Sequence, residues 1–486
     1  MIDSLKDSFW SILLVLNYLL AVIAIITILF KKINSSKTVA YILVLVFFPF
    51  FGLIVYYLFG QEYRKNKIFN RKDISNANII KSVGIDLHIE GREFAKDEFF
   101  DELDDKVKLI KLLKASEKSP LTLNNSIDIL KNGEVKFKLL IEDLKQAKKY
   151  IHLEYYIIKD DDIGTEILDI LSEKAKSGIE VKLSYDDVGS KLSSAMKRQL
   201  DESGVEHYPF MPVLFSSLTG KSNYRNHRKI AIIDGVIGYI GGINVSDEYI
   251  NNKKNKLFWR DTHLRIYGEA VKVLQFHFLT TWDFVSDSSL DINEKYFPSV
   301  DADENIAIQI AASGPDTNWA NIMEAMLTAI NNAENYIYIT TPYFIPNAQI
   351  ITALQIAAKI GVDVRLLIPK ASDSWIAANA TNSYLDELLF AGIKVYRYYK
   401  GFIHAKTLVV DDVFSTIGTC NLDNRSFNIN FEINALIYNE KQSKILKNQF
   451  LEDLKESDSV DFESWKKRSK LSKLQESFAR LWSPLL

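Results

Sequence analysis

Two long apolar runs open the chain before any regular alternation of polar and apolar residues begins. The first covers residues 9–30 ("FWSILLVLNYLLAVIAIITILF") and the second covers residues 39–59 ("VAYILVLVFFPFFGLIVYYLF"). Each reaches the roughly 20 apolar residues that a helix needs to cross a bilayer. The first run lacks a small-residue cleavage site and the second follows it at once, which disfavours a signal peptide. We therefore predict two transmembrane helices within residues 1–60.

Basic residues flank the second apolar run unequally. Three lysines precede it and five lysines and arginines follow it: Lys31, Lys32 and Lys37, then Arg64, Lys65, Lys67, Arg71 and Lys72. Because positive charge is retained on the cytoplasmic side, this asymmetry favours a cytoplasmic body. We expect a multi-pass protein of the cell membrane.

The remaining chain alternates strand-like and helix-like patterns after a polar linker, predicted for residues 61–125. Strands are expected at 150–160, 179–189 and 205–210, and helices at 164–178 and 195–204. Such alternation is typical of parallel-rich sheets with helices on their faces.

The same order of patterns returns in the second half of the chain. It runs through residues 336–346, 348–361, 362–374, 384–392 and 393–399. A duplicated unit predicts a two-lobed α/β molecule of mixed sheets flanked by helices. We assign the first repeat to residues 126–300, and the second, with a C-terminal tail, to residues 301–486.

Each repeat carries the pattern H-x-K-x4-D at the same place. Chance would give on the order of 0.05 matches in such a chain. In a strand, side chains at i and i+2 project from one face, so each His and Lys would point the same way. The candidate catalytic residues are His227, Lys229 and Asp234 in the first repeat, and His404, Lys406 and Asp411 in the second.

Two histidines and two lysines that project into one site suit the chemistry of a phosphodiester. The lysines would offset its negative charge. One neutral imidazole could attack phosphorus while the other, protonated, gives its proton to the leaving alcohol. Each aspartate would either orient an imidazole or hold the local loop. This chemistry needs no metal and no other cofactor.

The residues after each motif point to a known family. The two copies continue as "HRKIAIIDGVIGYIGGIN" (227–244) and "HAKTLVVDDVFSTIGTCN" (404–421). This signature resembles that of the phospholipase D superfamily, although Gly-Gly and Gly-Thr replace its usual Gly-Ser. A serine hydroxyl is therefore expected in neither copy.

Further segments make the resemblance narrower. The two apolar runs, "YIHLEYYIIKDDDIG", "TTPYFIP", "GTCNLDNRSFNINFE" and the terminal "ARLWSPLL" resemble the bacterial cardiolipin synthases over nearly the whole chain. That resemblance implies a phospholipase D-like fold and the conversion of two phosphatidylglycerols into cardiolipin and glycerol through a phosphohistidine.

The resemblance also suggests roles for individual residues. It makes His227 the nucleophile and His404 the general acid, although the near-symmetry of the repeats leaves the opposite assignment open. Asn244 and Asn421 are candidate substrate-binding residues. Glu432 either lines the site, as a third substrate-binding candidate, or forms an ion pair at a strand end.

Composition narrows the alternatives. The net charge of −3 and the pI near 6.2 argue against a nucleic-acid partner, although a membrane-tethered nuclease would share the motif. A phospholipase D-type hydrolase remains a second alternative. The single cysteine, Cys420, excludes an intramolecular disulfide and a cysteine-rich metal site. The expected partner is a membrane phospholipid, phosphatidylglycerol.

Two apolar stretches outside the motifs have two interpretations each. The loop 209–220 ("PFMPVLFSSLTG") would either pack in the core or dip into the bilayer. The tail 478–486 ("FARLWSPLL") would either dock on the domain or touch lipid.

Overall fold

A computed structural model describes most of the chain. The described residues are 2–30, 35–59, 106–117, 119–211, 224–252, 255, 257–286, 294–317 and 319–486. They fall into two compact units, Met1–Asn70 with Val213–Asn223, and Arg71–Pro212 with Tyr224–Leu486. The predicted loop 209–220 lies mostly outside the described residues.

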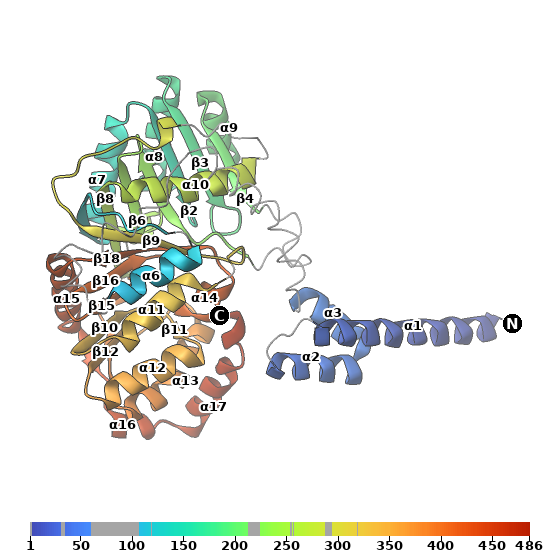
Figure 1. Cartoon of the computed structure of the whole chain (residues 1–486). Coiled ribbons are helices and arrows are strands. Elements are labelled where there is room, and N and C mark those ends of the chain that lie inside the picture. The colour runs from blue at the N-terminus through green and yellow to red at the C-terminus, as the bar shows by residue number, and fades with distance from the viewer. Residues whose placement is uncertain are drawn as a thin grey trace. The chain divides into compact units, whose positions relative to one another are not determined.

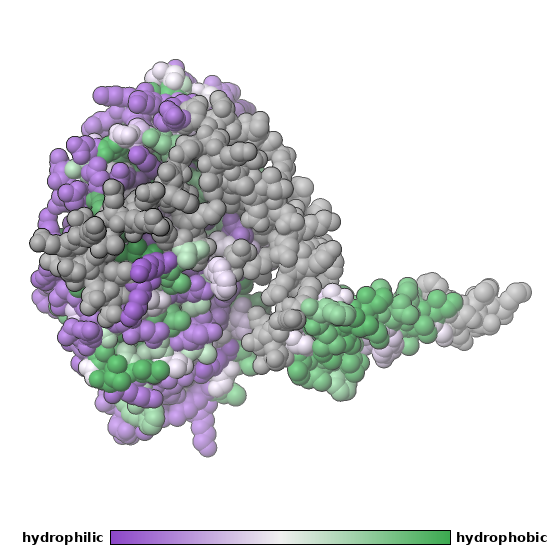
Figure 2. Space-filling view, viewed as in Figure 1, coloured by the Kyte–Doolittle hydropathy of each residue, from purple (hydrophilic) through white to green (hydrophobic). Residues whose placement is uncertain are grey.

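The first unit holds the N-terminal helices α1 (Ile2–Phe30), α2 (Ser35–Phe47) and α3 (Pro49–Phe59). Apolar side chains cover their surface (Figure 2). Among the described residues, one stretch is both long and apolar enough to cross a membrane, Trp10–Phe30 of α1. The first predicted span therefore forms as a helix of sufficient length.

The second predicted span is not one helix. It is interrupted at Phe48, between α2 and α3, because Pro49 has no N–H to donate to the preceding turn. A Cβ on Gly52 would lie 2.8 Å from the Val44 carbonyl oxygen, so the glycine permits the close approach after the break. The second predicted transmembrane helix is therefore observed as two shorter helices, α2 and α3.

The second unit contains two lobes, each built on a mixed sheet (Figure 1). The first sheet has the order β1-β8-β6-β5-β2-β3-β4. Its strands are β1 (Asn125–Lys131), β2 (Tyr150–Tyr155), β3 (Glu180–Asp186), β4 (Glu206–Phe210), β5 (Lys229–Ile233), β6 (Ile237–Gly241) and β8 (Thr262–Gly268). Helices α7 (Asn132–Gln146), α8 (Asp162–Lys176), α9 (Ser194–Ser203) and α10 (Ala270–Ser286) accompany them.

The second sheet repeats this arrangement with the order β19-β13-β12-β10-β15-β16-β18-β9. Its strands are β9 (Ala307–Ser313), β10 (Tyr336–Thr340), β12 (Asp363–Pro369), β13 (Lys394–Tyr398), β15 (Thr407–Val410), β16 (Phe414–Gly418), β18 (Glu432–Tyr438) and β19 (Ser457–Ser459). Each sheet contains three neighbouring parallel strands, β2-β3-β4 or β10-β12-β13, and the motif strand, β5 or β15, pairs antiparallel to the first of them. The duplication predicted from sequence is confirmed in the topology.

Helices also cover the second sheet. They are α11 (Asn321–Asn331), α12 (Ala348–Lys359), α13 (Trp375–Phe390), α14 (Asn424–Asn428), α15 (Glu440–Leu454), α16 (Phe462–Lys466) and α17 (Lys470–Arg480). Helix α6 (Lys106–Glu117) joins them, with Leu109 and Leu113 buried in the same apolar core. Part of the predicted linker 61–125 therefore belongs to the second lobe.

The two lobes share their junction. One apolar core contains Ile230 and Trp282 of the first lobe together with Val409 and Phe450 of the second. A short strand of the first lobe, β7 (Phe258–Arg260), pairs in parallel with β14 (Gly401–Ile403) of the second. Because β14 ends one residue before His404, the junction positions the second motif.

Candidate active site

The two motif histidines are each held by the backbone of the opposite lobe. The His227 N–H donates to the carbonyl of Phe431 at 2.9 Å. The His404 N–H donates to the carbonyl of Arg260 at 2.7 Å. Both histidines precede a buried motif strand, so the sequence pattern places them at equivalent ends of β5 and β15.

Each imidazole is also bonded to a carboxylate from the opposite lobe. His227 Nδ1 lies 2.9 Å from the carboxylate oxygens of Glu432, the first residue of β18. His404 Nδ1 lies 2.8 Å from Oδ2 of Asp261, the residue before β8. A hydrogen bond that occupies Nδ1 fixes the tautomer and leaves Nε2 as the reactive nitrogen. The pairs are therefore exchanged between the lobes.

Each motif lysine is bonded to the backbone carbonyl of the histidine two residues before it. Lys229 Nζ donates to the carbonyl of His227 at 2.7 Å, and Lys406 Nζ donates to the carbonyl of His404 at 2.5 Å. Burial lowers the pKa of Lys229 to about 7 and the pKa of Lys406 to about 8. Two desolvated ammonium groups make a site that is completed electrostatically by an anion.

The imidazoles are poised to be neutral when no anion is bound. Burial, with the charge of Lys229 next in size, holds the pKa of His227 well below its ordinary value. Burial and the charge of Lys406 lower the pKa of His404 to about 4. Burial raises the pKa of Glu432 to about 7. A neutral imidazole is the form that can attack an electrophile.

Asp234 and Asp411 lie away from the imidazoles. Asp234 accepts hydrogen bonds from the backbone N–H groups of residues 148–150 at 2.7–3.0 Å. Asp411 accepts from those of residues 334–336 at 2.8 Å. Each follows the far end of its motif strand, roughly 20 Å along the chain from the histidine. Of the two roles that the sequence left open for these aspartates, the geometry fits the loop-holding one, because their carboxylates bond to backbone N–H groups and not to the imidazoles.

The two motif asparagines are both buried beside the site. Asn244 Oδ1 accepts from the Ile157 N–H at 3.2 Å, and its amide donates to the Tyr249 hydroxyl at 2.5 Å. Asn421 Oδ1 is buried and has no hydrogen-bond partner among the described residues. The first asparagine is therefore committed to its own lobe, while the second retains an unused acceptor.

The small-residue turn differs between the copies. Thr419 Oγ1 donates to Glu432 Oε2 at 2.5 Å. At the matching position of the first repeat, a Cβ on Gly242 would overlap Oδ1 of Asp261. A hydroxyl is thus present in the second copy, supplied by threonine where the sequence comparison had considered serine alone.

Asp261 is the site residue that the sequence reasoning missed. A signal for it existed in the duplication. Asp261 immediately precedes β8 and Glu432 begins β18, and these two strands occupy the same place in the two sheets. Behind it, the Asn132 N–H at the start of α7 donates to the Asp261 carbonyl at 2.9 Å. One turn later, the Lys136 amine is buried with no hydrogen-bond partner among the described residues.

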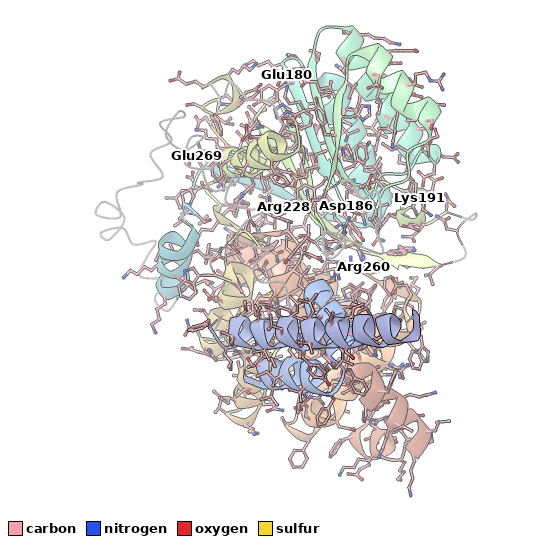
Figure 3. The ribbon with its side chains drawn as sticks, turned by 90° about the vertical axis from the view of Figure 1, so that its right-hand side faces the viewer. Glu180, Asp186, Lys191, Arg228, Arg260 and Glu269 are labelled. Carbon is pink, nitrogen blue, oxygen red and sulfur yellow. The ribbon has the colours of Figure 1, made fainter. Side chains whose placement is uncertain are left out.

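Two arginines tie the lobes together around the site (Figure 3). Arg228 Nε donates to the carbonyl of Glu432 at 3.4 Å, a long bond that crosses the junction. Arg260 Nε bonds the carboxylate of Asp453 on α15 at 2.8–2.9 Å. The backbone that receives the His404 N–H is therefore anchored to the second lobe.

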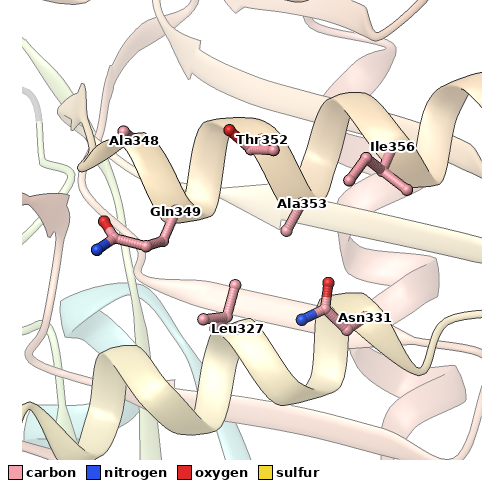
Figure 4. A pocket seen from close by; sticks show the side chains of 7 residues that line it. All are labelled: Leu327, Asn331, Ala348, Gln349, Thr352, Ala353 and Ile356. Carbon is pink, nitrogen blue, oxygen red and sulfur yellow. The ribbon is translucent and has the colours of Figure 1, made fainter.

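Away from the histidines, a pocket lies between α11 and α12 (Figure 4). It is lined by Leu327, Asn331, Ala348, Gln349, Thr352, Ala353 and Ile356. None of these side chains titrates near neutral pH, so this pocket offers no acid, base or nucleophile. The histidine pairs are the stronger candidate. Across the described part of the chain, no three His, Cys, Asp or Glu side chains are grouped to hold a metal ion.

Comparisons with known proteins agree with this geometry. A family model described as "Cardiolipin synthase, PLD-like domain" matches residues 140–282 and 326–454, and one described as "Phospholipase_D-nuclease N-terminal" matches residues 19–61. A cardiolipin synthase from Geobacillus sp. (strain WCH70) is 42% identical over 455 residues, covering 93% of this chain and 89% of the relative. One from Listeria innocua is 40% identical over 481 residues, covering 98% of each.

A solved structure supports the fold. The crystal structure of phosphatidylserine synthase from Haemophilus influenzae matches with a TM-score of 0.61 and 16% identity, covering 78% of this chain and all of that one. This likeness bears on the two-lobed architecture alone. The full-length relatives and the family model show that the chain is an enzyme of the cardiolipin synthase family, within the phospholipase D-like proteins.

Proposed function

We propose that this chain transfers a phosphatidyl group from one phosphatidylglycerol to another, giving cardiolipin and glycerol through a phosphohistidine intermediate. The observation that carries the proposal is the exchanged pair of imidazoles. Each has its Nδ1 bonded to a carboxylate of the opposite lobe and its Nε2 available, and a buried lysine is bonded to the backbone carbonyl of each histidine. The name shared by the full-length relatives supports phospholipid synthesis as the outcome.

In the first half-reaction His227 Nε2 attacks the phosphorus of the donor lipid. A P–N bond forms, the P–O bond to the headgroup glycerol breaks, and His404 gives its proton to the departing oxygen. The anionic donor raises the pKa of His404 on binding, which supplies the proton that the empty site lacks. Glu432 stabilises the positive charge that phosphorylation leaves on the His227 ring.

In the second half-reaction the same groups act in reverse. A primary hydroxyl of the second phosphatidylglycerol gives its proton to His404 and attacks phosphorus, and the P–N bond breaks. Lys229 and Lys406 offset the charge on the non-bridging oxygens in both steps. The product is cardiolipin, and His227 returns to its neutral form.

We further propose substrate contacts for the two asparagines. Asn421 Oδ1 is an acceptor without a partner among the described residues, so it would accept a hydrogen bond from a lipid hydroxyl. Asn244 would instead support the wall of the site through its bond to Tyr249. Glu432 touches the imidazole directly, which fits a role within the site and not an ion pair at an isolated strand end.

The N-terminal segment would anchor the enzyme in the membrane. We propose that Trp10–Phe30 spans the bilayer and that residues 39–59 form a second crossing, broken at Pro49, with the catalytic body in the cytoplasm. A fluorescent protein fused after Leu486 reports this topology, since it fluoresces when it folds in the cytoplasm. A dark but stably expressed fusion, with activity retained, contradicts the proposed orientation.

The reaction is tested by product analysis of the purified full chain in phosphatidylglycerol bilayers with EDTA present. One cardiolipin and one glycerol per turnover, at a rate that EDTA leaves largely intact, is the expected result. Phosphatidic acid without cardiolipin would instead make the protein a hydrolase. A loss of activity that Mg²⁺ restores would overturn the metal-free route.

A further inference from the structure

Helix α17 (Lys470–Arg480) and the two residues that follow it expose a stripe of large apolar side chains. Five large side chains face outward, with exposed fractions of 44–75%: Leu471, Leu474, Phe478, Leu481 and Trp482. The residues that it buries are Glu476 and Ala479. A helix on the surface of a globular domain ordinarily shows the opposite arrangement. A continuous apolar stripe of this kind marks a surface that meets another phase or partner.

Polar contacts fix this inverted orientation. Glu476 is paired with Arg468 at 2.8 Å, and Arg468 also reaches Asp386 of α13 at 3.1 Å. Arg480 pairs with Glu387 of the same helix at 2.9 Å. These bonds and the burial of Ala479 hold α17 against the domain, so the stripe cannot turn inward without breaking them.

The charge around the stripe favours an anionic surface. Residues 462–482 contain six lysines and arginines and two acidic residues, and one of the latter, Glu476, is buried in its ion pair. The exposed lysines of this segment are Lys466, Lys467, Lys470 and Lys473. An apolar stripe bordered by lysines is the pattern of a helix that lies in the interface of an anionic bilayer.

The segment is also connected to the site. After α17 the chain forms the 3-10 turn η5 (Ser483–Leu485). The backbone oxygen of the next residue, Leu486, accepts a hydrogen bond from the Arg425 N–H at 2.8 Å. Asn424 donates to the Ser483 carbonyl at 3.2 Å. Both partners lie on α14, and the charge of Arg425 contributes to the lowered pKa of His227. The C-terminus lies beside α14 in Figure 1.

We propose that α17 and Trp482 form a docking surface for an anionic phospholipid bilayer. The stripe enters the interface, the lysines meet the headgroups, and the η5–α14 connection sets the histidine site at the level where lipid headgroups lie. The last step rests on the proposed function, whereas bilayer contact itself does not. The tail 478–486 then both docks on the domain and touches lipid, by opposite sides.

The test places a fluorescent label at the stripe in the full-length protein. Cys420 is buried and its thiol pKa is raised by burial, so it competes poorly for a maleimide. A label on Leu474→Cys is compared with one on Ile360→Cys, an exposed apolar position on the end of α12. The unsubstituted chain is the labelling control.

In vesicles containing phosphatidylglycerol, we expect lipid-borne nitroxides to quench the Leu474→Cys label several-fold more than the Ile360→Cys label. The difference should fall in purely phosphatidylcholine vesicles, where headgroup attraction is lost. Equal quenching of the two labels overturns the proposal. Protection of the label from both lipid and aqueous quenchers also overturns the proposal, because protein then covers the stripe. Protection that does not change with protein density would identify the N-terminal helices as the cover, and protection that rises with protein density would identify a second copy of the chain.

A functional variant separates this inference from the proposed reaction. The double substitution Leu474→Glu and Phe478→Glu should lower turnover on vesicles about tenfold while leaving turnover of a dispersed short-chain lipid unchanged. Ile360→Glu serves as the matched control. Equal loss on both substrates would assign the effect to the fold and not to docking. If no reaction occurs in any form, the label measurement still decides bilayer contact.

Discussion

The two halves of the site share one frame but differ in what surrounds each imidazole. His227 is paired with a glutamate that also accepts the Thr419 hydroxyl, whereas His404 is paired with an aspartate that lies against Gly242. A longer carboxylate with a hydroxyl partner fills the same space as a shorter one beside a glycine. The duplication thus preserves geometry and varies the electrostatics.

The difference extends to the residue four positions after each motif asparagine. It is Glu248 in the first repeat, where it pairs with Lys159 at 3.1 Å, and Arg425 in the second. Arg425 adds to the positive charge that depresses the pKa of His227. This asymmetry is consistent with the proposed roles, in which His227 attacks as the neutral imidazole and His404 carries the proton.

Replacing either histidine gives the largest expected effect. His227→Ala and His404→Ala should each remove nearly all turnover of phosphatidylglycerol, by about 10⁴-fold or more, since both half-reactions use both rings. A donor lipid with a nitrophenol leaving group sharpens the comparison, because that group departs without a proton. Its release, measured by absorbance, should survive in His404→Ala and vanish in His227→Ala. The reverse pattern would exchange the two roles.

The carboxylates should rank next. Glu432→Gln keeps a hydrogen-bond acceptor for Nδ1 but removes the charge that stabilises a phosphorylated ring, so kcat should fall about 10²- to 10³-fold. In Asp261→Asn, kcat should fall by a similar factor. Mass spectrometry of rapidly quenched enzyme should show less phosphohistidine in Glu432→Gln than in Asp261→Asn. Equal amounts would contradict the asymmetric roles.

The motif aspartates should affect stability and not chemistry. Asp234→Asn and Asp411→Asn keep the left-handed backbone, with φ of 53° and 52°, that asparagine tolerates. Each weakens the set of backbone hydrogen bonds at its loop, so we expect a loss of about 1–3 kcal/mol in unfolding free energy. Turnover per folded molecule should stay within a few-fold of the parent. A 10³-fold loss in well-folded protein would restore them to the catalytic set.

Lys136 should give the smallest effect, and it concerns stability and its pH dependence. Burial holds the pKa of its amine well below the ordinary value, so protonation favours the unfolded chain. Ile322 precedes Tyr336 by the same interval by which Lys136 precedes Tyr150. Lys136→Met should therefore raise the midpoint of thermal unfolding near pH 7, and the gain should shrink as pH approaches about 10.5. A gain that grows with pH would contradict the cause.

Sequence predicted the features that repeat or that have a strong period. The duplicated H-x-K-x4-D frame led to the two lobes, and the length of residues 9–30 led to the first helix that is long and apolar enough to cross a membrane. Pro49 was visible within the second run, yet the helix break there follows from a steric and hydrogen-bonding conflict that hydropathy alone does not register.

Contacts between the lobes were the part that sequence could not give. Asp261 lies 143 positions from His404 and Glu432 lies 205 positions from His227, so no local spacing links them. The aspartates of the motifs are nearer in the chain but lie at the wrong ends of their strands. Proximity in sequence therefore could not decide between the two roles open to these aspartates, and the carboxylates bonded to the imidazoles become visible only when the lobes are docked.

The exchange of carboxylates between lobes has a consequence during synthesis. The first repeat is synthesised before the second. At that stage His227 is present without its partner Glu432, and Asp261 is present without its partner His404. Neither half alone holds a complete catalytic pair, so a partly made chain near the membrane carries no competent enzyme. Assembly of both imidazole–carboxylate pairs therefore requires synthesis of both repeats and docking of the two lobes.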